Sequence, residues 1–350
     1  MASENPKEDP EIKKATEKAM VQGNRDVGTQ RPFTLEYIDG LLTSDSERKE
    51  DINEQFSAGG LSIQLCEAKN IRSKQQDAYI VTEATSPNAP EFLKGAFDRI
   101  HKDLKDDPGK GILKESGAVA NMCFVSKDNH ITVANSGDCR TVMFVRNKTT
   151  GEVKPLRLSY DHKLEDPEIQ RQVKRSRYTI EDGRIIGKYG KYRQAKGFGT
   201  TLCGAVDYRP DITHYQPPEA EKLKEYDVYV CTACDGLYGK RLSEEDYGRA
   251  MQVFLAARRS DSELAKLFIR IALAKGVGDN ITLCITKLAP ERTQDIVMGV
   301  SDGHGKKGED VAKGVTDTMQ KIAENSLKPG SGKGFTGRLL SRFWSSGHGH

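Results

Sequence analysis

Hydrophobic and polar residues alternate over several short stretches of this 350-residue chain, which is the pattern of strands that bury one face. In the first stretch Leu61, Ile63 and Leu65 are separated by polar residues, and a second stretch, DAYIVTE, begins at Asp77. We expect these two strands to pair. Four more strands between residues 117 and 159 are separated by polar turns such as KDNH and TTGE, and are expected to form an antiparallel meander.

Other stretches repeat with the period of a helix. Pro90 opens one of them, whose apolar positions are Phe92, Ala96, Phe97, Ile100 and Leu104. Ser243 with Asp246 marks the start of a second helix, and a third runs from Asp261 to Ala274. Because the strands are numerous and the helices are grouped between them, we expect an α+β architecture in which helices flank antiparallel sheet.

Composition divides the chain into three regions. Residues 1–56 form a polar N-terminal tail with a candidate helix in the charged run 45–54, residues 57–326 form the folded domain, and residues 327–350 form a glycine- and serine-rich C-terminal tail that is flexible, basic and aromatic. Within the domain, residues 161–215 are polar and predict a long irregular excursion over the surface.

The overall charge excludes some classes of partner. The formal net charge is +3, from 54 basic and 51 acidic residues, so no general field attracts nucleic acid. Seven cysteines lie mostly in apolar runs, which is typical of reduced, buried thiols and indicates a cytoplasmic protein. No run of 18 apolar residues occurs, so we expect no membrane span.

Aspartates beside glycine or asparagine lie at the ends of four predicted strands. The motifs are SGDC at Asp138, ACDG at Asp235, VGDN at Asp279 and VSDG at Asp302. Each motif alone is an ordinary turn former. Together they offer hard oxygen ligands, and such a carboxylate cluster is stable only if divalent cations such as Mg²⁺ or Mn²⁺ neutralise it.

Two of these aspartates are expected to be neighbours. Asp279 begins the strand ITLCITKL, Asp302 ends the strand DIVMGVS, and the short polar connection APERTQ lies between the strands. An antiparallel hairpin would return the chain to its starting end and place the two carboxylates side by side.

The motifs together resemble the metal-dependent protein serine/threonine phosphatases of the type 2C class. The resemblance extends from about Leu61 to Ile322 and rests on RSKQQDA, GAVANMCFV, VANSGDCR, DHK at residues 161–163, VCTACDGLYG, GDNIT and MGVSDGHG. It implies that residues 57–326 are a phosphatase-like catalytic domain, a four-layer αββα fold with helices on both outer faces of an antiparallel β-sandwich. It also implies a centre of two Mn²⁺ or Mg²⁺ ions, with a third ion in some members.

The resemblance implies roles for single residues. The metal ligands would be Asp302, Gly303, Asp235, Asp279, Asp138 and Asp77. Among them Asp302 would bridge the two ions, the Gly303 carbonyl would bind one ion, and Asp138 would help to hold the third. His304 would be the general acid for the leaving alkoxide, and Arg72 would clamp the substrate phosphate with its planar fork of donors. Metal-bound water would supply hydroxide at neutral pH.

The chain departs from the family pattern in two places. In the family the DGHG strand directly follows the strand that begins at the acidic pair, whereas here Asp77 begins that strand and DGHG comes last, so a segment is transposed to the C-terminal side. Gln76 replaces a glutamate of that acidic pair, which removes one negative charge near the metal ions.

Other interpretations of these residues remain open. A catalytically weak relative that binds phosphoproteins as a scaffold would also fit Gln76 and the altered order. The CTAC pair, Cys231 and Cys234, would suit a thiol oxidoreductase, although it lies within a strand and lacks a second CxxC motif. Considered singly, His304 would be a solvated loop residue and Arg72 a surface residue.

The expected partner is a phosphorylated protein substrate, and the protein is expected to be a monomer. The C-terminal cluster around FTGRLLSRFW would suit a weak surface contact with an anionic membrane or a groove on a partner, while its glycines favour disorder. The identity of the substrate does not follow from these residues.

Overall fold

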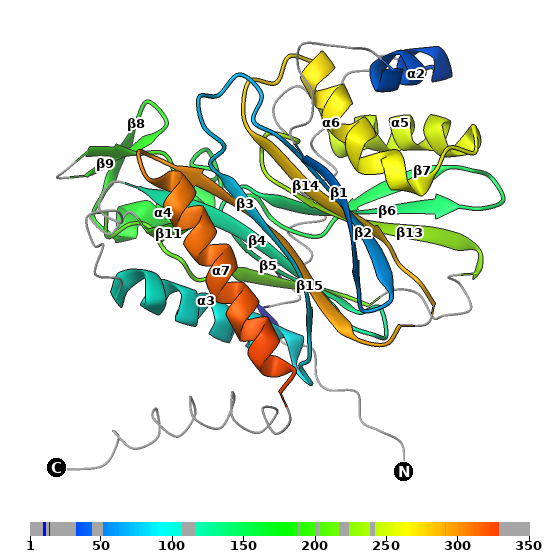
Figure 1. Cartoon of the computed structure of the whole chain (residues 1–350). Helices are drawn as coiled ribbons and strands as arrows, with labels where there is room; N and C mark the ends of the chain where they lie inside the picture. Colours follow the sequence, from blue (N-terminus) through cyan, green and yellow to red (C-terminus); the bar gives the residue numbers. More distant parts are fainter. Residues whose placement is uncertain are drawn as a thin grey trace.

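Two antiparallel sheets packed face to face form the centre of the protein, and helices cover both outer faces (Figure 1). The structure is a computed structural model that describes residues 10–11, 14, 33–43, 52–106, 116–187, 190–199, 203–216, 224–238, 242–290 and 292–328. The predicted α+β class and its four αββα layers are confirmed. The C-terminal tail from residue 329 and most of the charged run 45–54 lie outside the described residues.

The first sheet contains six strands. Their order is β1 (Ile52–Ala58), β2 (Leu61–Ala68), β14 (Ile281–Lys287), β13 (Tyr226–Ala233), β6 (Arg140–Asn147) and β7 (Val153–Arg157). The second sheet has the order β12 (Asp211–Tyr215), β5 (Ile131–Ser136), β4 (Gly117–Val125), β15 (Asp295–His304) and β3 (Asp77–Ala84), with the short β11 (Phe198–Gly199) also paired to β4. The most C-terminal strand therefore lies in the middle of the second sheet.

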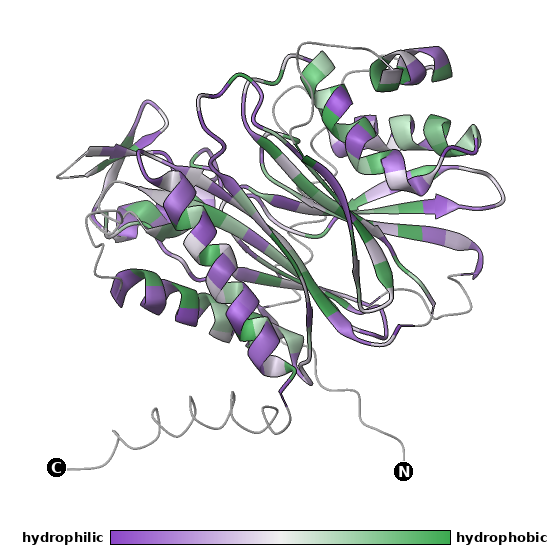
Figure 2. Cartoon of the chain, in the orientation of Figure 1, coloured by the Kyte–Doolittle hydropathy of each residue, from purple (hydrophilic) through white to green (hydrophobic). Residues whose placement is uncertain are grey.

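Each sheet buries its outer face under helices. The second sheet is covered by α3 (Ala89–Asp106) and α7 (Gly308–Ser326). The first sheet is covered by α5 (Glu244–Ala256) and by α6 (Leu264–Ala274), which follows the 3₁₀ turn η2 (Asp261–Glu263), and α2 (Leu35–Thr43) packs on these two helices. Figure 2 shows polar residues along the outward surface of α3 and α7, as expected for amphipathic helices. The helix predicted from Pro90 is confirmed, with Phe92, Ala96, Phe97 and Ile100 buried.

Local sequence signals position the helix ends as predicted. The Ser243 side chain accepts from the Asp246 backbone N–H, and the Asp246 carboxylate accepts from the Ser243 backbone N–H, which completes a capping box at the start of α5. The helix predicted from Asp261 to Ala274 is also present, with its first turn as η2.

Several predicted strand pairings are wrong, because neighbouring strands belong to different sheets. The expected meander is divided: β4 pairs with β5 and β6 pairs with β7, but β5 and β6 lie in opposite sheets. Strand β2 pairs with β1 and β14 rather than with β3. Alternation along a strand predicts that one face is buried, and both sheets of a sandwich satisfy this equally.

The crossing between sheets depends on a glycine. Gly137 lies between β5 and β6 with φ of 122°, and a Cβ built on it would lie 2.2 Å from the Cβ of Val119. No other residue type adopts this backbone conformation against so close a neighbour without strain. The crossing carries Asp138 to the end of the sandwich.

The excursion after residue 160 is more regular than predicted. It contains α4 (Pro167–Arg175) and a small sheet of β8 (Thr179–Glu181), β9 (Arg184–Gly187) and β10 (Gly190–Tyr192). Buried apolar side chains between them, such as Ile169, Val173, Ile185 and Tyr192, form a separate small core. The excursion is therefore a structured flap.

The described fold also begins earlier than the boundary predicted at residue 57. Strand β1 starts at Ile52, and α2 packs on α5 and α6, where its Ile38 is fully buried. Among the residues that the structure describes, no helix combines the length and hydrophobicity needed to span a bilayer.

Candidate metal centre

Three aspartates from different parts of the chain meet at one end of the sandwich. Asp302, near the end of β15, lies directly opposite Asp77, the first residue of β3. The Asp302 carboxyl group also lies close enough to Asp77 and to Asp235, which follows β13 in the other sheet, for their negative charges to help raise its pKa after burial. The structure therefore brings together Asp77, Asp235 and Asp302 as the sequence predicted.

The route by which they meet differs from the predicted hairpin. Strands β14 and β15 are not paired: β14 lies in the first sheet beside β13, and β15 lies in the second sheet between β3 and β4. Asp279 and Asp302 reach the same end because the two sheets stack with these strand ends together. The predicted hairpin is wrong, but the expected gathering of carboxylates at one end is observed.

Burial and mutual repulsion destabilise the ionised forms of these carboxyl groups. Loss of solvation, followed by the negative charges of the neighbouring aspartates, raises the pKa of Asp302 well above its ordinary value. Loss of solvation also raises the pKa of Asp77 to about 6, that of Asp235 to about 6 and that of Asp138 to about 7, with neighbouring carboxylates adding to each shift. A cation bound among them would relieve this cost.

The donor set fits Mn²⁺ or Mg²⁺. Every candidate ligand is an oxygen, as these hard cations prefer, and the buried Oδ1 atom of Asp77 has no hydrogen-bond partner among the described residues. In the described part of the chain no group of three or more His, Cys, Asp or Glu side chains surrounds a single point. Each ion would therefore use one or two carboxylates, with the Gly303 carbonyl and water completing its shell, which is how proteins usually bind Mg²⁺.

Gly303 is held where only glycine fits. A Cβ at this position would lie 2.2 Å from the carbonyl oxygen of Gly308 and 2.6 Å from that of Gln76. The Gly303 N–H donates to the same Gln76 carbonyl at 3.0 Å. The backbones at Gln76 and Gly308 therefore approach β15 closely beside Asp302.

A cavity of ≈ 370 Å³ opens above this cluster and includes the two residues predicted to act on substrate. Arg72 lines the cavity, is about half exposed, and forms an ion pair with Asp279. His304, the last residue of β15, also lines it, and burial lowers its pKa to about 4. In this structure Asp279 is the partner of Arg72, and after burial its negative charge also helps to raise the pKa of Asp77 and Asp235.

Gln76 lines the cavity together with the aspartates, and it is held there by hydrogen bonds from its side chain and its backbone. Its side-chain amide donates to the Gly305 carbonyl at 2.8 Å, and its backbone N–H donates to the side chain of Asn280 at 3.0 Å. A glutamate could not donate to that carbonyl. Gln76 therefore braces the loop after β15.

Asn280 is a positioning residue to which sequence reasoning gave no role. Its side-chain amide donates to the carbonyls of Lys69 at 2.9 Å and Lys74 at 3.0 Å, and its oxygen accepts from Gln76. These bonds fix both ends of the loop that carries Arg72. The motif GDNIT contained the signal, because an asparagine directly after a turn aspartate is well suited to cap backbone groups.

Asp138 lies at the side of the cluster and contacts the flap. The Gln194 amide donates to both Asp138 oxygens, at 3.2 and 3.3 Å. Burial and neighbouring carboxylates raise the pKa of Asp138 and Asp235, and the positive charge of Lys163 offsets a small part of this rise. Sequence reasoning gave no role to Gln194 or Lys163, although Lys163 is part of the DHK motif.

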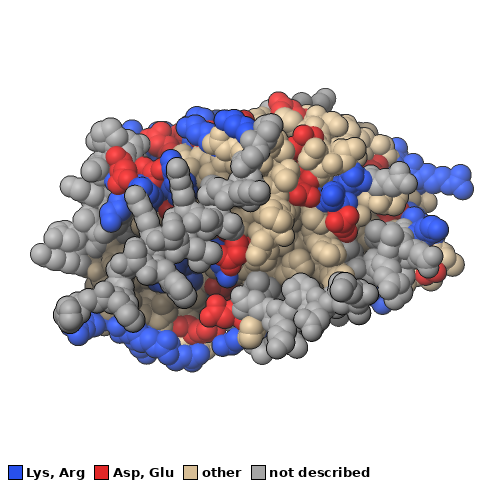
Figure 3. Space-filling view, turned by 90° about the horizontal axis from the view of Figure 1, so that it is seen from below, with Lys and Arg blue, Asp and Glu red and all other residues tan. Residues whose placement is uncertain are grey.

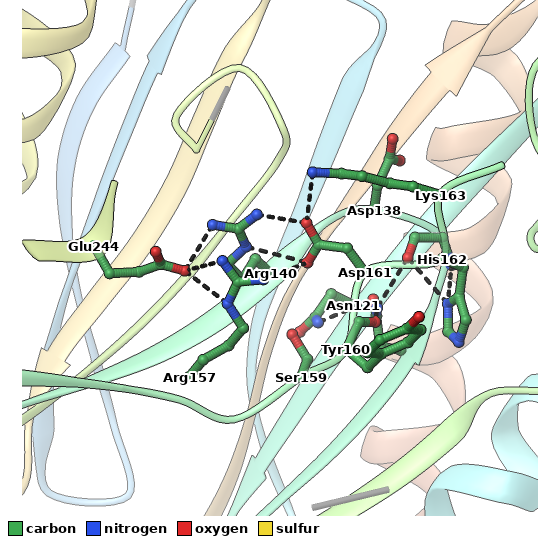
Figure 4. Close-up of polar contacts among 12 residues, drawn as sticks. Asn121, Asp138, Arg140, Arg157, Ser159, Tyr160, Asp161, His162, Lys163 and Glu244 are labelled. Atoms are coloured by element: carbon green, nitrogen blue, oxygen red, sulfur yellow. Dashed lines mark hydrogen bonds and ion pairs between the residues drawn. The ribbon is translucent and has the colours of Figure 1, made fainter. Parts of the chain in front are cut away.

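A buried network of charges lies beside the DHK loop (Figure 4). Arg140 donates to Asp161 at 2.5 Å and to Glu244 at 2.6 Å, and Arg157 also pairs with Glu244 at 2.5 Å. Lys163 contacts Asp161 as well, at 3.2 Å. The charged residues of this network are all buried, namely Arg140, Arg157, Asp161 and Glu244. Each buried charge therefore depends on its partners in the network. The network links β6, β7, α5 and the DHK loop.

The αββα sandwich with an acidic, oxygen-rich cleft at the ends of its strands defines the class of metal-dependent phosphatases that the motifs resemble. A comparison with known families matches residues 37–281 to protein phosphatase 2C. The chain belongs to the protein phosphatase 2C family. Members are serine/threonine protein phosphatases that depend on Mn²⁺ or Mg²⁺.

Individual relatives are distant. The chain is 24% identical over 307 residues to "Protein phosphatase 2C homolog 2" of Aspergillus fumigatus, covering 81% of this chain and 68% of the relative. It is 30% identical over 191 residues to "Protein phosphatase ppm-1.G" of Caenorhabditis elegans, covering 49% of this chain and 35% of that protein. The chain thus spans between about a third and two thirds of the length of these relatives.

The fold is shared with a solved phosphatase. A serine-threonine phosphatase 2C from Toxoplasma gondii superposes with a TM-score of 0.51 at 13% sequence identity, covering 68% of this chain and 99% of that structure. At this level of identity the likeness concerns the fold alone.

Proposed function

We propose that this chain hydrolyses phosphoserine and phosphothreonine in proteins, with two and up to three Mn²⁺ or Mg²⁺ ions in the acidic cleft. The convergence of Asp77, Asp235 and Asp302 beside Arg72 and His304, all at one end of the sandwich, carries the proposal. Bound cations would supply hydroxide at neutral pH and offset charge on the phosphoryl oxygens.

The remaining steps belong to side chains of the cleft. Arg72 would exchange its contact with Asp279 for two oxygens of the substrate phosphate, for which its planar fork is suited. His304 would give a proton to the leaving serine or threonine oxygen, after the dianionic phosphate has favoured its protonated form. Asn280 and Gln76 would hold Arg72 and the loop after β15 in place.

The experiment measures hydrolysis of a small aryl phosphate with added Mn²⁺. We expect turnover that EDTA abolishes and that falls about 100-fold or more in Asp302→Asn and Asp235→Ala, since even partners outside the ligand shell are worth 10–100-fold. The control is Lys154→Gln on the exposed edge strand β7, which should behave as wild type. Turnover and Mn²⁺ affinity that are unchanged in Asp302→Asn would refute the proposal.

The same experiment separates the rival function. A phosphoprotein-binding relative without catalysis would bind a phosphopeptide yet show no Mn²⁺-dependent turnover.

Thiol chemistry is disfavoured because burial raises the pKa of both Cys231 and Cys234, to about 12 for Cys231. All seven cysteines are buried thiols, which supports the cytoplasmic location that we propose.

We also propose that β15 and α7 are a unit transposed from the position after β3. Strand β15 pairs with β3 along its length, and its first residue, Asp295, lies opposite Ala84, the last residue of β3. The end of α7 returns to the same place, where the Ser326 hydroxyl accepts from the Thr85 N–H at 2.9 Å. A chain that ran from β3 through β15 and α7 into α3 would need only short connections, and the family match ends at residue 281, before this unit.

A further inference from the structure

Three basic side chains of the flap line one side of the cavity. They are Arg184 at the start of β9, Lys191 in β10 and Arg193 directly after β10. Strand alternation explains their common direction: Ile185 and Tyr192 are buried in the small core of the flap, so their neighbours face the other way. We call Arg184, Lys191 and Arg193 the basic wall.

The positive charges of the basic wall are not neutralised by ion pairs with described carboxylates. Within the described ranges no carboxylate forms an ion pair with any of its three cations, although Glu181 lies opposite Arg184 in the pairing of β8 with β9. Some exposed cations elsewhere are paired, for example Lys313 with Asp317 and Arg99 with Asp103. On the face in Figure 3, acidic and basic side chains are interspersed. The basic wall thus gathers three cations without an ion-pair partner among the described carboxylates on one side of a single cavity.

A hydrogen-bonded contact next to the basic wall holds the flap against the acidic cleft. Gln194 follows Arg193 directly and bonds both oxygens of Asp138. On the other side Tyr192 packs among Ile169 and Val173 of α4. The three cations thus stand at a fixed place relative to the carboxylates instead of on a free loop.

The balance of charges in the cavity indicates that the basic wall has a role other than binding the reacting phosphate. In the proposed function bound cations would match the cleft aspartates, and Arg72, which lines the same cavity, would bind the reacting phosphate. A substrate with acidic groups a few residues from the phosphorylated residue would supply the missing partners for the wall. An extended peptide advances about 3.3 Å per residue, so neighbours one to three positions away reach beyond the reacting phosphate.

We propose that the basic wall makes this enzyme select phosphopeptides that carry Asp, Glu or a second phosphorylated residue next to the target residue. This inference deepens the proposed function and rests on it. It names a class of substrate that the phosphatase fold does not specify.

The test uses three phosphothreonine peptides that differ only in their flanking residues, which are Glu, Gln or Lys. With Mn²⁺ present, kcat/KM should fall in the order Glu, Gln, Lys, with about tenfold between the extremes, the sum of three exposed ion pairs of ordinary strength. The triple variant Arg184→Gln, Lys191→Gln, Arg193→Gln should bring the ratio close to one. Added salt should also reduce it, since exposed charges are screened.

A control variant makes the same change of charge elsewhere. Lys102→Gln, Lys154→Gln, Lys313→Gln removes three exposed lysines from α3, β7 and α7 and should keep the full preference. Equal kcat/KM for the three peptides in the wild type would overturn the inference. So would a preference that survives in the basic-wall variant or is lost equally in the control.

Two further outcomes are informative. If the aryl phosphate is not hydrolysed, the proposed function fails, and the inference is then decided by binding: fluorescence anisotropy must show that the Glu-flanked phosphopeptide binds more tightly to wild type than to the basic-wall variant. If a soluble inositol phosphate headgroup is hydrolysed faster than every peptide, the wall serves that chemistry and the peptide inference is wrong.

Discussion

At the scale of single residues, the site consists of reactive groups and of groups that hold them. Asp302, Asp77 and Asp235 belong to the first kind, while Asn280 and Gln76 belong to the second because their hydrogen bonds end on backbone atoms. The motifs predicted the aspartates because carboxylates at strand ends have an evident chemistry. They did not predict Asn280 or Gln194, since a side-chain amide in a turn motif has many ordinary explanations.

The positioning role of Asn280 can be measured. Asn280→Ala removes two bonds to the ends of the Arg72 loop and leaves the carbonyls of Lys69 and Lys74 without this donor. We expect kcat/KM to fall about tenfold or more, mostly through a higher KM, because the phosphate clamp is no longer held in place. Steady-state kinetics with a phosphopeptide would measure this.

A purely structural role of Asn280 would give a different result. It would lower the melting temperature while leaving the KM of the folded enzyme unchanged. Thermal unfolding of the variant, measured alongside the kinetics, separates the two.

At the scale of elements, the sequence predicted most helices and strands but not how the strands are divided between the two sheets. The segment at residues 117–159 shows the difficulty, because β5 and β6 are adjacent in sequence yet lie in opposite sheets. The deciding feature is the backbone at Gly137, whose need for glycine becomes visible only when Val119 is placed beside it.

The crossing at Gly137 predicts a large effect of a small substitution. Gly137→Ala would combine an unfavourable φ with a clash against Val119, and should lower the free energy of unfolding by about 3 kcal/mol. Gly151→Ala is the matched control, because Gly151 also has a positive φ (77°) but a Cβ added there would meet no described atom within 4 Å. Urea denaturation of both variants would show whether the contact adds to the strain; equal losses would contradict this.

At the scale of the whole molecule, two sheets and one buried charge network determine how remote segments meet. The network of Arg140, Asp161, Arg157 and Glu244 joins strands, a helix and the DHK loop, and its charges are matched only in the folded chain. The stabilisation that these ion pairs contribute is therefore present only in the folded chain, and it depends on the pH because the carboxylates must be ionised.

Acid should weaken the protein through Asp161. Burial alone would raise its pKa, but the ion pair and hydrogen bonds with Arg140, assisted by Lys163 and Arg157, outweigh burial and hold the pKa at about 2. Because the folded pKa is depressed, the stabilisation is present above about pH 4 and is lost as the pH falls through about 2, a change of about 2 kcal/mol. Denaturation free energies measured from pH 5 to 2 should fall more steeply in wild type than in Asp161→Asn; parallel curves would disprove the assignment.

The proposed transposition can be reversed in the laboratory. A chain in which residues 295–328 are inserted between Ala84 and Thr85 with short Asn-Gly and Gly-Ser connections, and which ends at residue 294, keeps every strand pairing of the second sheet. We expect it to fold and to retain Mn²⁺-dependent phosphatase activity within about tenfold. The same insertion after Asn147, between β6 and β7, is the control and should abolish folding.

By itself the sequence determined the α+β class, the helices, the carboxylates available at strand ends and, through its motifs, the family. These depend on local periodicity, on capping and on residue chemistry, all of which are present in short stretches of chain. Only the tertiary structure decided the division of strands between the sheets, the approach of Asp302 to Asp77 and Asp235, and the basic wall of the flap opposite them. Each of these is a contact between segments far apart in the chain, and alternation along one strand carries no information about which sheet, and which neighbours, the strand will join.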